Sequence, residues 1–112
     1  MSYEIKEDGK FKFIEEGNGE PLMFLHGLFG ALSNFDAQIE FFRKQYRVIV
    51  PLLPLLELDL LHTSVSGIEK FVQKFIEYKE YKEIHLVGNS LGGHVALLHI
   101  LKHPENIKSL VL

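Results

Sequence analysis

Short apolar runs alternate with longer segments of helical period along this chain. Continuous apolar runs, typical of strands that are covered on both faces, occur at residues 21–27, 48–50, 83–88 and 107–112. Segments whose apolar residues recur at helical spacing lie between them, at residues 34–45, 66–76 and 91–103. This alternation predicts an α/β fold with a mostly parallel sheet and crossover helices.

The N-terminal part has a different pattern. Apolar and polar residues alternate at 3–6 and 10–15, and Asp8-Gly9 between them is a favourable hairpin turn. We therefore expect an antiparallel pair of strands at one edge of the sheet. Residues 21–27 follow a glycine-rich turn and are expected to form a central strand.

Each predicted helix has a start or stop signal. Ser33 is expected to cap the first helix, and Pro104 to end the last one. Ser66 and Glu69 have the spacing of a capping box at the start of the second helix. Its buried stripe comprises Ile68, Phe71, Val72, Phe75 and Ile76.

Length and composition describe one small globular domain. The chain has 112 residues, of which 46% are hydrophobic, so a single core over residues 1–112 is expected. Twelve Lys and Arg against fifteen Asp and Glu give a net charge of -3. Because there is no excess of cations to neutralise phosphates, nucleic acid is excluded as a partner.

The chain contains no cysteine, which excludes disulfides, thiolate metal sites and a cysteine nucleophile. Residues 1–8 are acidic and lack the apolar segment of a signal peptide, and no apolar run reaches the ~18 residues of a membrane span. These features predict a cytoplasmic protein.

The candidate chemistry lies at residues 88–93, Gly-Asn-Ser-Leu-Gly-Gly, between a predicted strand and a predicted helix. This is the context of the GxSxG nucleophile elbow, in which a strained turn lifts the serine hydroxyl out of the sheet. Ser90 is the predicted nucleophile. Gly88 and Gly92 are expected to be glycines because side chains at these positions would collide with the neighbouring strand and helix. The Leu91 N–H, at the positive end of the helix, is expected to be one oxyanion donor.

A second oxyanion donor must come from another loop. His26-Gly27-Leu28-Phe29-Gly30 directly follows the predicted central strand, so this loop is expected beside the elbow. The Leu28 N–H is the candidate donor, with His26 and Gly27 supporting the loop.

Through HGxxG after one strand and GNSLGG after a later one, nearly the whole chain resembles the α/β-hydrolase family. The resemblance implies a serine hydrolase that cleaves an ester, amide or carbon–carbon bond of a small-molecule substrate without a cofactor. It also implies the strand order 1-2-4-3-5-6.

The chain departs from the family pattern in two places. Residues 51–61 are rich in leucine where many members carry Asp-x-Pro-Gly. After Ser90 the acid Glu105 has no histidine beyond it, so the triad cannot be completed in the family order. We therefore expect an N-terminal part of the fold, with six strands and three helices. Its acid and base would lie beyond Leu112, and it would have little turnover alone.

The remaining histidines have simpler interpretations. His26 is expected to make a structural hydrogen bond, and His94 a packing or loop contact. His99 and His103 are four residues apart, but the glutamate of an HExxH motif is missing. We expect them at the surface and predict no metal site.

Two other classes of function are weighed against the hydrolase. A non-catalytic binding module would bury its open sheet against a second copy of the chain, and its mass would reveal the self-association. A nucleotide-binding domain is disfavoured because neither GxGxxG after the first strands nor GxxxxGK[ST] is present.

Overall fold

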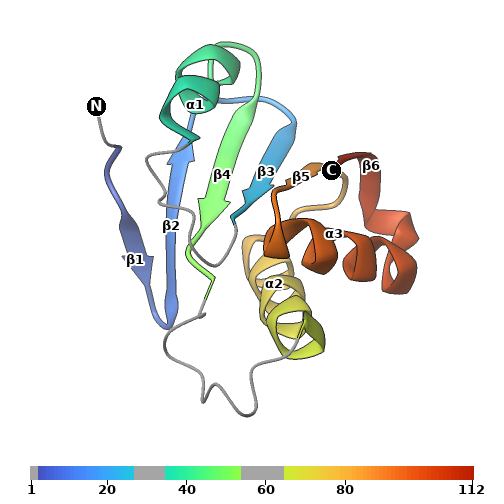
Figure 1. Cartoon of the computed structure of the whole chain (residues 1–112). Coiled ribbons are helices and arrows are strands. Elements are labelled where there is room, and N and C mark those ends of the chain that lie inside the picture. Colours follow the sequence, from blue (N-terminus) through green and yellow to red (C-terminus); the bar gives the residue numbers. More distant parts are fainter. Residues whose placement is uncertain (1–2, 27–34, 54–64) are drawn as a thin grey trace.

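Six strands form one mixed sheet in the computed structural model, which describes residues 3–26, 35–53 and 65–112 (Figure 1). The strands are β1 (Lys6–Asp8), β2 (Phe11–Glu16), β3 (Pro21–Leu25), β4 (Arg47–Pro51), β5 (Ile84–Gly88) and β6 (Ile107–Val111). Their order across the sheet is β1-β2-β4-β3-β5-β6, which confirms the predicted order. Strand β2 is antiparallel to β1 and β4, whereas β4, β3, β5 and β6 are parallel neighbours.

The helices cover the two faces of the sheet unequally. Helix α1 (Asp36–Phe42) lies on one face, and α2 (Val65–Lys79) and α3 (Leu91–Lys102) lie together on the other (Figure 1). A short 3₁₀ helix, Pro104–Asn106, connects α3 to β6. The α/β fold with a mostly parallel sheet and three α-helices is thereby confirmed for the described residues. None of the described helices is long and apolar enough to cross a membrane.

Two apolar clusters follow from this arrangement. The larger one packs α2 and α3 against the sheet and includes Met23, Leu25, Val72, Phe75 and Leu86. The smaller one packs α1 against the opposite face and includes Leu22, Phe24, Ile39 and Val48. Neighbouring residues of β3 thus contribute to different clusters, which makes β3 a central strand buried on both faces, as predicted.

The structure corrects the predictions for the first hairpin and for the capping box, and it does not test a third local prediction. The first strand is Lys6–Asp8 rather than 3–6, with Asp8 paired to Phe11 across the hairpin turn, so the turn residues are Gly9 and Lys10. Helix α2 already begins at Val65, and Glu69 lies buried in its fifth position, so the capping box is wrong. Ser33, the predicted cap of α1, lies outside the described residues.

Candidate active site

Ser90 stands at the turn that joins β5 to α3. Its backbone has φ 58° and ψ -121°, one of two positive φ values among the described non-glycine residues. A positive φ is strained for a residue with a side chain and persists only where the surrounding structure enforces it. The residue is exposed, and its hydroxyl makes no capping bond to α3. The turn thus presents a serine hydroxyl to solvent.

Close backbone contacts enforce this turn. A Cβ added to Gly92 would lie 2.1 Å from the carbonyl oxygen of Leu25 in β3. A Cβ added to Gly88 would lie 2.6 Å from the carbonyl oxygen of Gly92 and from the Cα of Gly93. The first turn of α3 therefore packs against the end of β3 at a distance that excludes any side chain.

Backbone hydrogen bonds fix the turn to its neighbours. The Asn89 N–H donates to the Leu25 carbonyl at 3.0 Å, which ties the turn to β3. The N–H groups of Gly92 and Gly93 donate to the carbonyls of Asn89 and Ser90 at 2.9 and 2.8 Å. The Leu91 N–H precedes both at the start of α3, where a helix has no internal acceptor for it. Its role as an oxyanion donor stays a prediction.

His26 lies at the end of β3, next to this turn. It is buried, and its Nε2 accepts a hydrogen bond from the Leu53 N–H at 3.0 Å. This bond ties the end of β3 to the residues that follow β4. Gly27 and Leu28 lie outside the described residues, so the second oxyanion donor stays a prediction.

Hydrogen bonds of three described histidines go to residues other than Ser90: His26 accepts from Leu53, His85 contacts Glu20 and Ser109, and His99 contacts Glu69. His94 is exposed one turn into α3. The described residues thus place the Ser90 hydroxyl directly before the first backbone N–H of α3.

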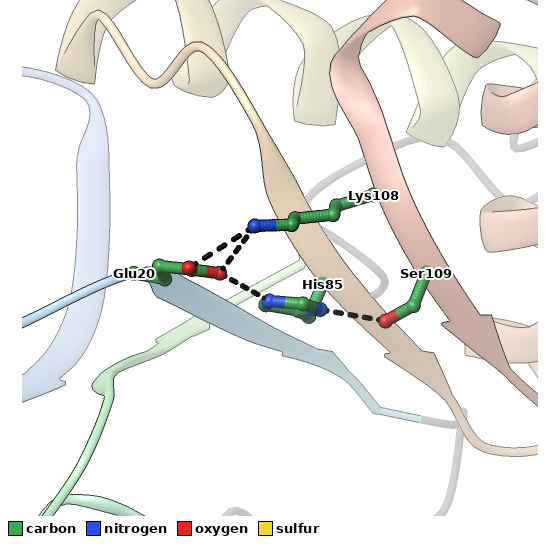
Figure 2. A network of polar contacts seen from close by, with 4 residues as sticks. All are labelled: Glu20, His85, Lys108 and Ser109. Atoms are coloured by element: carbon green, nitrogen blue, oxygen red, sulfur yellow. Dashed lines mark hydrogen bonds and ion pairs between the residues drawn. The ribbon is translucent and has the colours of Figure 1, made fainter.

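A serine–histidine–glutamate network does occur elsewhere in the sheet, and the sequence analysis did not anticipate it. Figure 2 shows His85 of β5 between Glu20 and Ser109, with its Nε2 2.6 Å from Glu20 Oε2 and its Nδ1 2.7 Å from Ser109 Oγ. Lys108 donates to both carboxylate oxygens of Glu20 at 3.1 and 3.2 Å. The bonds from His85 and Lys108 hold the pKa of Glu20 below its ordinary value.

The position of this network separates it from Ser90. His85 precedes Ser90 by five residues along β5 and its turn, a span of about 16 Å in extended chain. Ligands of parallel sheets bind at the carboxyl ends of the strands, whereas Glu20 lies just before β3 and His85 near the start of β5. We therefore interpret the network as a structural contact that joins the amino ends of β3, β5 and β6.

The prediction that His99 and His103 are surface residues is wrong for His99. Its side chain is 0% exposed, and its Nδ1 lies 2.7 Å from Oε2 of Glu69, which is 1% exposed. Burial lowers the pKa of His99 below its ordinary value, although the bond to Glu69 opposes this shift. The sequence could not show this pair, because Glu69 belongs to another helix, 30 residues away.

Comparison with known proteins agrees with this geometry. The family described as alpha/beta hydrolase fold matches residues 61–112. Ethanol acetyltransferase 1 of Cyberlindnera jadinii is 28% identical over 100% of this chain and 35% of its own length. The monoacylglycerol lipase abhd6-B of Xenopus laevis is 28% identical over 100% of this chain and 36% of its own length.

A solved structure extends the agreement to three dimensions. MGS-MChE2, an alpha/beta hydrolase enzyme from the metagenome of lagoon sediments of Mar Chica, Morocco, superposes with a TM-score of 0.91 and 45% identity. The match covers 96% of this chain and 49% of that protein. The chain thus spans half or less of the length of these relatives. With its strand order, its GNSLGG turn and these similarities, the chain has the α/β-hydrolase fold of the matched part of these relatives.

Proposed function

We propose that this chain supplies the nucleophile and the oxyanion site of a serine hydrolase that acts on an ester or related acyl bond. The observation that carries the proposal is the exposed Ser90 at positive φ, enforced by the contact between Gly92 and Leu25. A serine in a structural turn needs no such strain, whereas a nucleophile must stand clear of the sheet to reach a carbonyl carbon.

The proposed reaction is acyl transfer. The Ser90 Oγ attacks the substrate carbonyl and passes its proton to a general base, and the carbonyl oxygen becomes an oxyanion that accepts a hydrogen bond from the Leu91 N–H. Collapse of this intermediate releases the alcohol, which takes up the proton, and leaves an acyl-serine. Water then gives a proton to the base and attacks the acyl carbon, the carboxylic acid is released, and the Ser90 Oγ takes the proton back. The Leu28 N–H is the proposed second donor, and the base and its acid are proposed to lie beyond Leu112.

The substrate class follows from the reaction and from the relatives. An acetyltransferase and a monoacylglycerol lipase are both named for acyl groups. Residues 51–61 are rich in leucine, and apolar residues of this kind suit an apolar acyl group. We therefore place acyl esters ahead of amides and carbon–carbon bonds as substrates.

Covalent labelling tests the proposal directly. A fluorophosphonate probe reacts with activated serines, so incubation with the full-length protein is expected to add one probe, located by peptide mapping at Ser90. The Ser90→Ala variant should lose the label. The matched control is Ser109→Ala, which removes another exposed serine, distant from the turn, and should label like the wild type.

Folding must be verified in the same samples by circular dichroism. A folded full-length protein that takes up no probe, or that is labelled equally after Ser90→Ala, contradicts the proposal. The 112-residue chain tested alone should label far more slowly, because removing triad members leaves only the residual catalysis of the oxyanion hole and binding.

A second candidate function is assembly without catalysis. Strand β6 is an edge of the sheet, and Val111 and Leu112 at its end are 59% and 67% exposed. These exposed apolar residues favour burial against a second copy of the chain.

A further inference from the structure

Two buried residues, Glu69 and His99, and the partly exposed His103 form a group of potential metal ligands between α2 and α3. Glu69 lies on α2, whereas His99 lies on α3 and His103 one turn later, at the helix end. Each offers one ligand atom, and the three atoms lie within 4.8 Å of one another. Two helices that are distant in sequence therefore bring a carboxylate and two imidazoles to one point.

Hydrogen bonding within the protein does not satisfy this group. The Oε2 atom of Glu69 lies 2.7 Å from His99 Nδ1 but 3.6 Å from His103 Nε2, which is too long for a hydrogen bond. The Nε2 atom of His99 is buried without a hydrogen-bond partner in the part of the chain that the structure describes. Glu69 and His103 thus face each other without a hydrogen bond between them.

The distances suit a tetrahedral cation. Zinc binds histidine nitrogen and carboxylate oxygen at about 2.0–2.1 Å, which places adjacent ligand atoms of a tetrahedron ~3.3 Å apart. The observed separations of 2.7 and 3.6 Å lie on either side of this value. All three ligand atoms lie within 4.8 Å of one another, so movements of these side chains would bring both nitrogens and Oε2 to bonding distance of one ion.

The surroundings of the group also fit. Lys102 Nζ lies 3.4 Å from Oε1 of Glu69, so it holds the carboxylate oxygen that faces away from His99. Ligating carboxylates commonly have such a second contact, which fixes their orientation. The His103 side chain is 28% exposed and gives an ion a path to the buried pair.

We propose that Glu69, His99 and His103 bind a divalent transition-metal ion, with Zn²⁺ the best chemical fit. The ion clamps α2 to α3. His99 lies eight residues after Leu91, about 12 Å further along the helix, so the ion takes no part in chemistry at Ser90. Its effect is on the stability of the two helices that cover one face of the sheet.

Calorimetric titration of the metal-free protein with Zn²⁺ tests this assignment. We expect one ion per chain and a rise in the thermal midpoint as Zn²⁺ is added, because an ion that binds only the folded state stabilises it. His103→Gln removes the partly exposed ligand and should weaken binding by at least ~100-fold, more than the loss of an outer partner. His94→Gln is the matched control, since it removes an exposed histidine of the same helix.

The variants distinguish the outcomes. Tight binding that survives His94→Gln and is lost in a folded His103→Gln supports the site. Binding that is equal in the two variants shows adventitious surface ligation and overturns the proposed site. The absence of stoichiometric binding when protein and Zn²⁺ are mixed 1:1 also overturns it. Glu69→Gln serves as a second ligand variant where circular dichroism shows that it folds. Labelling of Ser90 reports separately on the hydrolase proposal.

Discussion

Glycine at two positions makes the conformation of Ser90 possible. The carbonyl of Leu25 occupies the space that a Gly92 side chain would need, and the first turn of α3 occupies that of a Gly88 side chain. The helix start is thereby pressed against the end of β3, and the chain between β5 and α3 must reverse within a few residues. Ser90 makes this change of chain direction by adopting a φ of 58°. Strain at this residue is thus coupled to packing at its neighbours.

Substitution of Gly92 should therefore disrupt the turn. Gly92→Ala places a Cβ 2.1 Å from the Leu25 carbonyl oxygen and is expected to lower the free energy of unfolding by about 3 kcal/mol, the upper end of the range for overpacking. Gly93→Ala is the control. Its Cβ would meet the Gly88 carbonyl oxygen at an ordinary 3.5 Å, so it should gain roughly 0.5 kcal/mol from helix propensity. Urea unfolding of both variants measures the difference, and similar midpoints would contradict the steric argument.

Residue types near the turn could be predicted from the sequence, but long-range pairs could not. The motif GNSLGG between a strand and a helix gave the positions of Ser90, Gly88 and Gly92, because the spacing itself determines the turn. Glu69 was assigned to a helix cap because its local spacing to Ser66 allows one. Its partner His99 is brought next to it only by the packing of α3 on α2. No local sequence pattern predicts that packing.

At the scale of elements, Glu15 connects β2 to the end of α2. Its carboxylate accepts a hydrogen bond from the Tyr81 hydroxyl at 2.7 Å and pairs with Lys79 Nζ at 3.1 Å. Burial by itself would raise the pKa of Glu15, but the bonds from Tyr81 and Lys79 outweigh it and lower the pKa below the ordinary value of 4.5. Burial and the same bond raise the pKa of Tyr81 far above its usual range.

This carboxylate should contribute to acid unfolding. Because its pKa is lower in the folded state, the folded protein binds fewer protons, so the contribution is present above pH 4.5 and is lost as the pH falls through the folded-state pKa. Glu15→Gln is expected to lower the free energy of unfolding at pH 7 by about 1 kcal/mol, because solvent screens this partly exposed group, and to flatten the pH dependence below 4.5. Urea midpoints between pH 7 and pH 3 test this. Glu7→Gln, at an exposed position of β1, should retain the wild-type profile.

Strands and helices were predicted well where the pattern was strong. The order of elements and the central position of β3 followed from apolar runs and helical spacing. The predicted first strand starts three residues too early because all residues of Lys6–Asp8 are exposed and charged, and they carry no apolar signal. Its pairing with β2 comes from the hairpin turn and the backbone, so a hydrophobic pattern could not locate it.

At the scale of the whole molecule, the two edges of the sheet are protected to different degrees. Strand β1 has three residues, all charged and exposed, and short charged edges resist pairing with another chain. Strand β6 has five residues and ends in exposed Val111 and Leu112. Leu97 and Leu101 on α3 are also exposed. Any pairing of this sheet with a further strand is therefore expected at β6.

The mass of the 112-residue chain tests how this edge is used. If β6 pairs with a second copy, light scattering should give a dimer that Val111→Lys converts to monomer, because a charge on an edge strand opposes pairing. Phe41→Lys is the control, since it changes an equally prominent apolar residue, 67% exposed, on α1. A dimer unaffected by Val111→Lys would contradict pairing through β6. A folded monomer would contradict the assembly function. The hydrolase proposal would then be the remaining function for this fold, and the β6 edge could pair with a further strand.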